Sequence, residues 1–154
     1  MDFLMSETQR ILVESARAYC ADHEAQWLDP AKALNRAGDE AIQTEWSQIV
    51  NLGWTGMLVS EQYGGSELGV TEAVLLCEEL AYGGCPLPFV SSAMVPAGVL
   101  GLLGDDNAGA VEALRRLVEA GSRTVVAIAE ASGEWSLHGV AARAAVGDSV
   151  SFEK

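Results

Sequence analysis

The sequence predicts a mostly α-helical chain, with a bundle of about five helices over residues 1–122 and the first strands of an incomplete second domain over residues 123–154. Two observations lead to this fold class. Up to Gly121, apolar residues recur every three or four positions, which is the period of an amphipathic helix. From Arg123 onward this period stops and β-branched residues follow one another, which is typical of strands.

Composition excludes several classes of protein. Hydrophobic residues make up 49% of the 154 residues and charged residues 20%, which excludes a disordered tail and a disulfide-stapled scaffold. The 22 acidic and 9 basic residues give a formal net charge of −13, so we expect no binding to nucleic acid, whose phosphates would be repelled. Three cysteines without a CxxC pair and an acidic N-terminus favour a cytoplasmic protein with neither disulfides nor a signal peptide.

The first two helices have clear start signals. Ser6 and Gln9 have the spacing of a capping box, so a helix is expected to begin after Ser6. The residues expected on its inner face are Ile11, Leu12, Ser15, Ala16, Tyr19 and Cys20. A second helix is expected between Asp39, as its cap, and Gly53. Its inner stripe is expected to be Ile42, Trp46, Ile49 and Val50.

Two later helices are predicted in the same way. The third is expected to run from a Thr71 cap to Gly83. Its inward residues are expected to be Val74, Cys77, Leu80 and Ala81. The fifth is expected to be capped by Asp105 or Asp106 and to end at Gly121. Its inward residues are expected to be Val111, Leu114, Leu117 and Val118.

The fourth helix lies in an uncharged stretch, residues 86–104, which is long enough to span a bilayer. Three prolines interrupt this stretch and its N-terminal flank lacks basic residues, so we expect no membrane insertion. Pro88 is well placed as the first residue of the helix. Because the helix has no polar face, we expect neighbouring elements to cover it nearly all round.

The C-terminal part is expected to form strands. Candidate strands are Thr124 to Ala129, Val140 to Val146 and Ser149 to Phe152. A remainder of about thirty residues rarely closes a sheet or covers its edges without further chain. We therefore expect the sequence to stop inside a second domain.

Reactive side chains alone do not predict an active site. His23 and His138 are far apart and neither has a second ligand at metal-binding spacing, so we expect surface or capping residues rather than metal ligands. The three cysteines are expected to be structural, because no histidine is placed by sequence to activate them. Adjacent Glu78 and Glu79 are expected to face solvent or a neighbouring helix.

A distinctive order of motifs runs through the helical part. Leu52-Gly53-Trp54-Thr55-Gly56-Met57 precedes Val59-Ser60-Glu61-Gln62-Tyr63-Gly64-Gly65, and Cys77-Glu78-Glu79-Leu80-Ala81 follows on a helix. This order resembles the N-terminal helical domain of the flavin-dependent acyl-CoA dehydrogenases, which have a similar "GW.G…PE.YGG" loop and then a helix that ends in "EEL". The similarity covers residues 1 to about 135, and Ser60 stands where that loop usually has proline.

The resemblance implies an all-helical N-terminal domain, a β-barrel-like middle domain beginning near Thr124 and a C-terminal four-helix bundle, usually assembled as a tetramer. It implies an oxidoreductase that desaturates the α,β bond of an acyl-CoA thioester. In this family the catalytic base is a Glu on the C-terminal bundle, so no catalytic residue is expected within residues 1–154. FAD is the cofactor expected for the complete protein, and we expect this piece alone to bind it weakly or not at all.

The resemblance also implies contacts with the acyl chain. A helix at the position of residues 88–103 lines the acyl pocket in this family. Phe89, Val90, Met94 and Val95 are therefore expected to contact the substrate. Plain packing in the core is the alternative for each of them.

Contacts with the flavin are implied for a strand that begins at Val126. Val126, Ile128 and Ala129 are the residues expected to contact the cofactor. Ala129 stands where the family usually has a hydroxyl, and its absence removes one hydrogen bond of about 0.5–1.5 kcal/mol. Ala131 replaces the usual proline, and Glu134-Trp135-Ser136 replaces Gly-Ser-Asp. These departures favour an alternative, a non-catalytic assembly subunit paired with a flavin-binding partner, as in the heteromeric steroid-degrading members.

The partners implied by the resemblance are an acyl-CoA substrate, electron-transfer flavoprotein as the electron acceptor, and further subunits of a homo- or hetero-oligomer. The pathway would be fatty acid or steroid degradation. A stand-alone helical interaction module is a third hypothesis. We expect the 154-residue piece to be inactive by itself.

Overall fold

The structure is a computed structural model that describes residues 4–29, 39–119, 121–127, 133, 143–146 and 150–153. Its α-helices are α1 (Glu7–Trp27), α3 (Asp39–Asn51), α4 (Val70–Tyr82), α5 (Val95–Leu102) and α6 (Ala108–Glu119). Short 3-10 turns lie at Trp54–Gly56 and Glu61–Tyr63, and a π-helical turn, Val90–Met94, leads directly into α5. The strands are β1 (Arg143–Val146) and β2 (Val150–Glu153). The mostly helical N-terminal part is therefore confirmed.

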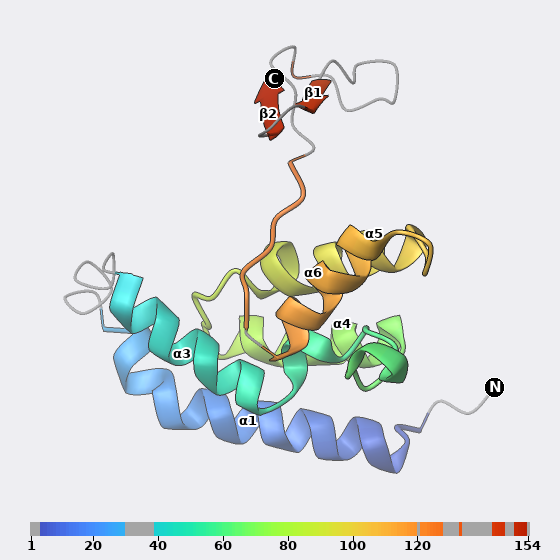
Figure 1. The fold of residues 1–154 in the computed structure, drawn as a ribbon. Coiled ribbons are helices and arrows are strands. Elements are labelled where there is room, and N and C mark those ends of the chain that lie inside the picture. The colour runs from blue at the N-terminus through green and yellow to red at the C-terminus, as the bar shows by residue number, and fades with distance from the viewer. Residues whose placement is uncertain are drawn as a thin grey trace.

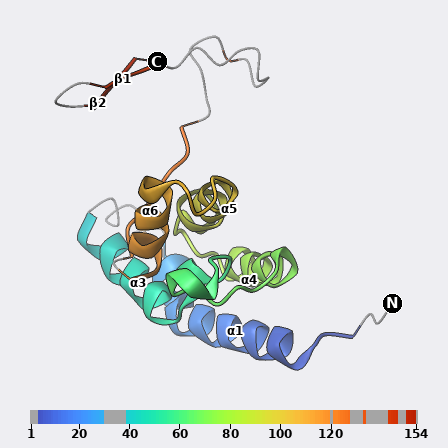
Figure 2. The ribbon, with the colours of Figure 1, turned by 45° about the vertical axis from the view of Figure 1, so that its right-hand side comes forward.

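The helices stack in successive layers. Figures 1 and 2 show α3 and α4 lying on α1, with α6 and α5 above them. The core between these layers is one cluster of buried side chains drawn from every helix. Its largest fully buried members include Trp46, Ile49, Leu76 and Leu117.

The start of α1 follows the predicted capping box. The Ser6 hydroxyl accepts from the Gln9 amide at 3.1 Å, and the Gln9 side chain accepts from the Ser6 amide at 2.9 Å. The inner face buries most of the predicted residues, namely Leu12, Ala16, Tyr19 and Cys20. Ile11 is a correction, because it is 57% exposed while Val13 is buried. Neighbouring residues of a helix point about 100° apart, so Ile11 lies on the side of α1 that faces away from the stripe containing Leu12, Ala16 and Tyr19.

The predicted inner face of α4 is confirmed at Leu80 and partly at Cys77, which is half-buried against the core, and is wrong at Val74 and Ala81. The buried residues of α4 are Ala73, Leu76 and Leu80, whereas Val74 is 54% exposed and Ala81 also faces solvent. Gly69, not Thr71, is the N-cap residue. In a helix rich in apolar residues several stripes fit the same period, and the packing partner decides which one is buried. Here the partner is α1, which lies alongside α4 (Figure 1).

The predicted inner faces of α3 and α6 are buried as expected, although the cap of α6 differs. Trp46 and Ile49 of α3 and Leu114 and Leu117 of α6 are buried in the core. The α6 cap is Asn107, whose side chain accepts from the Ala110 amide at 3.0 Å. Neither Asp105 nor Asp106 holds that position, because each lies too far before the first helical turn to reach its amides.

The Tyr-Gly-Gly motif forms a tight loop between α3 and α4. Gly64 adopts a φ of +87°, in the left-handed region that favours glycine. A Cβ atom on Gly65 would lie 2.0 Å from the carbonyl oxygen of Val59, so only glycine fits this approach. The amides of Ser66, Glu67 and Leu68 then donate to carbonyls of Gly56, Val59 and Met57.

The first strand expected in the C-terminal part is not formed by the residues that the structure describes. Residues 121–127 have no regular secondary structure, so the described part of the first candidate strand, 124–127, is not a strand. β1 and β2 pair antiparallel, with Arg143 opposite Glu153. Within the described ranges, no helix is long and apolar enough to cross a membrane.

Candidate functional site

The helix that begins after Pro88 carries two apolar stripes on different faces. Phe89, Ala93, Pro96 and Ala97 follow the spacing i, i+4, i+7, i+8 and are buried against the core. Val95, Val99, Leu102 and Leu103 repeat the same spacing on another face and are exposed. The expectation that neighbours cover this helix nearly all round is therefore wrong for the described residues. An exposed apolar stripe of this kind is typical of a surface that contacts a ligand or another protein segment.

Two glycines of the same helix are open to solvent. Cβ atoms built on Gly98 and Gly101 would meet no heavy atom within 4 Å, so open space lies above both residues. We call the surface formed by Val90, Val95, Val99, Leu102 and Leu103 the apolar face.

The acyl-contacting residues expected from the resemblance fall at three depths. Val90 and Val95 belong to the apolar face and are 51% and 40% exposed. Met94 is half-buried between that face and the core. Phe89 is 3% exposed and packs into the core on the buried side of the helix. These residues therefore share one helix, while only the two valines open widely to solvent.

A sulfur contact supports Met94 from the neighbouring helix. The Cys77 Sγ atom of α4 lies 3.1 Å from the Met94 Sδ atom. Burial raises the pKa of the Cys77 thiol, so the neutral thiol is the form that packs against the thioether. Sequence reasoning placed Cys77 on the inner stripe and did not identify this contact.

A proline frees one carbonyl at the π-helical turn. In a regular α-helix the Ser92 carbonyl would accept from the amide of residue 96, but Pro96 has no N–H group. The π-turn absorbs this break, and the Val95 amide donates to the carbonyl of Val90. The Ser92 carbonyl instead accepts from the Thr124 amide at 3.3 Å.

That hydrogen bond brings the predicted flavin-contacting segment to the helix. Val126 lies two residues beyond Thr124 and is half-buried, whereas Ile128 and Ala129 lie outside the described residues. Val126 has no polar side-chain group with which to hydrogen-bond a flavin, and residues 121–127 present no side-chain cluster that would hold a phosphate. The described residues therefore do not by themselves form a site for FAD.

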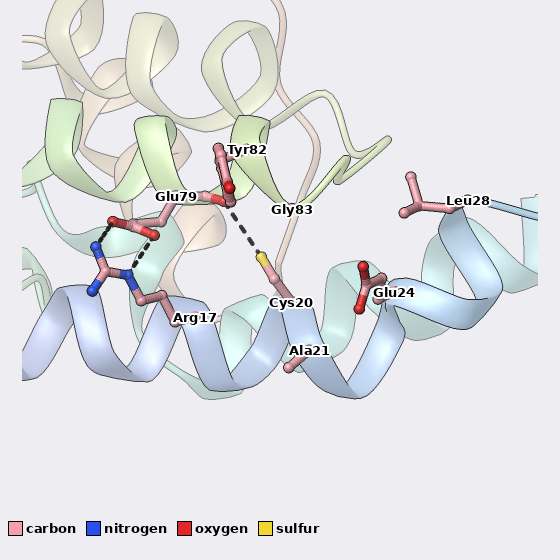
Figure 3. A pocket seen from close by; sticks show the side chains of 8 residues that line it. All are labelled: Arg17, Cys20, Ala21, Glu24, Leu28, Glu79, Tyr82 and Gly83. Atoms are coloured by element: carbon pink, nitrogen blue, oxygen red, sulfur yellow. Dashed lines mark hydrogen bonds and ion pairs between the residues drawn. The ribbon is translucent and has the colours of Figure 1, made fainter.

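A separate pocket of about 260 Å³ lies between α1 and the end of α4 (Figure 3). Arg17 and Glu79 pair across its rim at 2.7 Å, and this hydrogen-bonded charge raises the pKa of Arg17. The Cys20 thiol points to the Glu79 carbonyl at 3.6 Å, and burial raises the pKa of the thiol. Glu79 thus faces a neighbouring helix, one of the two outcomes expected for it. Sequence reasoning missed the pocket, because its walls come from residues about sixty positions apart.

A buried carboxylate lies where α1 meets α3. Glu45 is 4% exposed and accepts from the Trp27 indole at 3.1 Å and from the Gln26 amide at 3.0 Å. His23 stacks on Trp27 and its ring nitrogens contact the Tyr19 carbonyl and Gln48. His23 is thus part of a helix contact, and His138 lies outside the described residues. Within the described ranges, no three metal-binding side chains come together.

Comparison with protein families identifies the helical part. Residues 6–108 match the family model described as "Acyl-CoA dehydrogenase, N-terminal domain". The chain belongs to the acyl-CoA dehydrogenase family. The resemblance seen in the Trp-Thr-Gly and Tyr-Gly-Gly loops is thereby confirmed.

Individual members of the acyl-CoA dehydrogenase family align with part of the chain. The mitochondrial isovaleryl-CoA dehydrogenase of Pongo abelii is 35% identical over 78 residues, 50% of this chain and 18% of that protein. An L-prolyl-(peptidyl-carrier protein) dehydrogenase of Serratia sp. is 34% identical over 84 residues, 54% of this chain and 20% of that protein. The mitochondrial isovaleryl-CoA dehydrogenase of Bos taurus is 31% identical over 80 residues, 50% of this chain and 18% of that protein. No solved structure gives a significant match.

Proposed function

We propose that the chain is the N-terminal helical domain, residues 1–122, with the start of the middle β-domain, residues 123–154, of an FAD-dependent acyl-CoA dehydrogenase subunit. In the complete protein the reaction is α,β-desaturation of an acyl-CoA thioester. The apolar face is the observation that carries this proposal. A family member that leaves five large apolar side chains in water on one helix has a surface suited to an acyl tail.

The tail would lie along the start of the apolar face. Val90 and Val95 supply its contact surface, and Met94 forms the floor between them and the core. Phe89 keeps the helix in place from below and acts as a support. The rest of the apolar face, around Leu102 and Leu103, is proposed to be covered by other protein segments of the assembly.

Hydrophobic transfer sets the strength expected of such contacts. Each buried methylene contributes about 0.8 kcal/mol, which corresponds to roughly fourfold in affinity. We therefore expect the affinity for acyl thioesters to rise by about that factor per methylene until the slot is filled.

This chain's part in the reaction is binding and orientation of the tail. Proton abstraction is proposed to belong to a carboxylate outside residues 1–154. FAD, when bound in the complete protein, supplies the oxidising group, and electron-transfer flavoprotein is the proposed acceptor. We further propose a cytoplasmic homo- or hetero-oligomer. The relatives act on acyl-CoA or carrier-bound acyl groups according to their names, which supports a thioester as the substrate class.

The test uses the assembly that contains this chain, purified from the organism that produces it, with each substitution introduced into this chain. Val95→Asp places a charge on the apolar face, and Val70→Asp places the same charge on an exposed position of α4. We expect Val95→Asp to raise KM for acyl thioesters at least tenfold and Val70→Asp to change it less than twofold. Equal KM values for the two variants, or no thioester oxidation by the unmodified assembly, would contradict the proposal.

The second candidate function is a non-catalytic assembly subunit that pairs with a flavin-binding partner. It is favoured by the departures from the family pattern at Ala129, Ala131 and Glu134. Absorbance near 450 nm separates the two functions. A yellow assembly made of this polypeptide alone favours the enzyme, and a yellow colour that follows a second polypeptide favours the assembly subunit.

A further inference from the structure

We propose that Pro96 is a positioning residue. By withholding an amide from the Ser92 carbonyl, it reserves that carbonyl for Thr124 and so fixes the segment that leaves the helical domain to the π-helical turn. The importance of this anchor for substrate binding rests on the proposed function, whereas the anchor itself does not.

The anchor, the hydrogen bond from the Thr124 amide to the Ser92 carbonyl, depends on a hydrogen-bond donor that the helix lacks. Pro96 is fully buried and continues the helix without an N–H group, so one backbone acceptor has no partner at the usual position. Ser92 is also buried, and a buried carbonyl without a hydrogen bond is costly. The Thr124 amide removes this cost at 3.3 Å. The helix therefore gains stability from holding residues 121–127.

The other end of the segment is held independently. The Trp46 indole donates to the Gly121 carbonyl at 2.6 Å, and the Ser122 amide donates to the Arg116 carbonyl at 3.1 Å. Gly121 has a φ of +59°, which turns the chain out of α6 toward α5. Two fixed points, Gly121 and Thr124, leave only two residues between them. The direction of the chain at Val125 is thus defined by the helical domain.

The anchored amide joins the segment to the π-helical turn that precedes α5. Val125 is 68% exposed and follows the anchored amide directly, while Ser92 lies in the π-turn between Val90 and Val95. The segment is therefore tied to the same π-helical turn whose Val90 is proposed to contact the acyl tail. Loss of the anchor would loosen the support of this turn without touching the reacting carbon atoms.

The first measurement is hydrogen exchange at residues 121–127 of this chain. Thr124→Pro removes the donor, Pro96→Ala restores a competing amide for Ser92, and Thr124→Ala is the matched control that keeps the Thr124 N–H group. We expect exchange of the amide at position 124 to rise about 2- to 10-fold in Pro96→Ala and to stay unchanged in Thr124→Ala. Unchanged exchange of this amide in Pro96→Ala, or an equal rise in Thr124→Ala, would overturn the anchor.

The second measurement follows KM and kcat in the assembly purified from its own cells. We expect Thr124→Pro to raise KM for acyl thioesters several-fold with kcat within twofold, and Thr124→Ala to behave like the unmodified chain. Equal KM values for Thr124→Pro and Thr124→Ala would overturn the positioning role. If the unmodified assembly does not oxidise acyl thioesters, the proposed function fails, while hydrogen exchange still decides whether the anchor exists.

Discussion

The indole Nε1 of Trp46 donates a hydrogen bond to the carbonyl of Gly121 at 2.6 Å, across 75 positions of sequence. Trp46 is fully buried in α3, and Gly121 ends the turn that follows α6. A Cβ atom on Gly121 would lie 2.6 Å from the Val50 Cγ2 atom, so the chain approaches α3 as closely as glycine allows. This contact joins α3 to the residues that follow α6.

Removal of that indole donor should destabilise the fold. Trp46→Phe keeps most of the apolar surface but leaves the buried Gly121 carbonyl without its donor, so we expect a loss of about 1–3 kcal/mol in the free energy of unfolding. Urea denaturation measures the change. A loss below about 0.5 kcal/mol, the range of neutral surface substitutions, would show that the contact contributes little.

Two glycines should respond in opposite ways to alanine, because Gly83 is closely packed and Gly98 lies in open space. A Cβ atom on Gly83 would lie 2.5 Å from the Cys20 Cβ atom, so Gly83→Ala should destabilise the chain by about 1–3 kcal/mol through overpacking. Gly98 lies inside α5 with open space around it, so Gly98→Ala should stabilise the chain by about 0.5–1 kcal/mol. Thermal unfolding of both variants tests the pair, and shifts of the same sign would be inconsistent with this packing.

The cap of α6 can be tested against the sequence prediction. Asn107→Ala removes the side-chain acceptor of the Ala110 amide, so we expect a loss of about 0.5–2 kcal/mol. Asp106→Ala serves as the control, because Asp106 was predicted as a cap and its side chain does not cap α6. Chemical denaturation should rank the two variants clearly. A larger loss for Asp106→Ala would restore the sequence prediction.

Acid pH should weaken one contact between α1 and α4. The side-chain amide of Gln9 donates to Glu72 Oε1 at 2.8 Å, and this hydrogen bond holds the pKa of Glu72 below its ordinary value of 4.5. A lowered folded-state pKa adds stability above the unfolded-state pKa, and that stability is lost as the pH falls through the folded-state value.

Glu72→Gln should therefore be less stable than the unmodified chain at pH 7, and the difference should shrink as the pH falls below about 4. Denaturation curves at several pH values measure this difference. A difference that stays constant down to pH 2 would show that the ionised carboxylate makes no special contribution.

Local signals in the sequence predicted much of the fold. The Ser6–Gln9 capping box and the Trp46–Ile49 stripe depend on residues within one or two helical turns, so they can be recognised without tertiary structure. The buried stripe of α4 could not be fixed in this way. Several apolar stripes compete in that helix, and contact with α1 selects the one that contains Leu76.

The candidate site was less accessible to sequence reasoning. The resemblance placed Val90, Val95 and Phe89 together on a helix expected to line the acyl pocket, but only the structure separates the exposed face of the two valines from the buried face of Phe89. The bond between Thr124 and Ser92 joins residues 32 positions apart, and no local pattern encodes it. Contact of these residues with an acyl chain, and of Val126 with a flavin, stays a prediction.

Photolabelling tests whether the apolar face contacts the substrate. An acyl-CoA thioester with a photoreactive group at the end of its tail is irradiated with the assembly purified from its own cells, and the labelled peptides are mapped by mass spectrometry. We expect the label on residues 89–102, with loss of the label when excess unreactive acyl-CoA is added. Competed labelling elsewhere in the assembly, with none on residues 89–102, would contradict the proposed acyl-binding role of this helix.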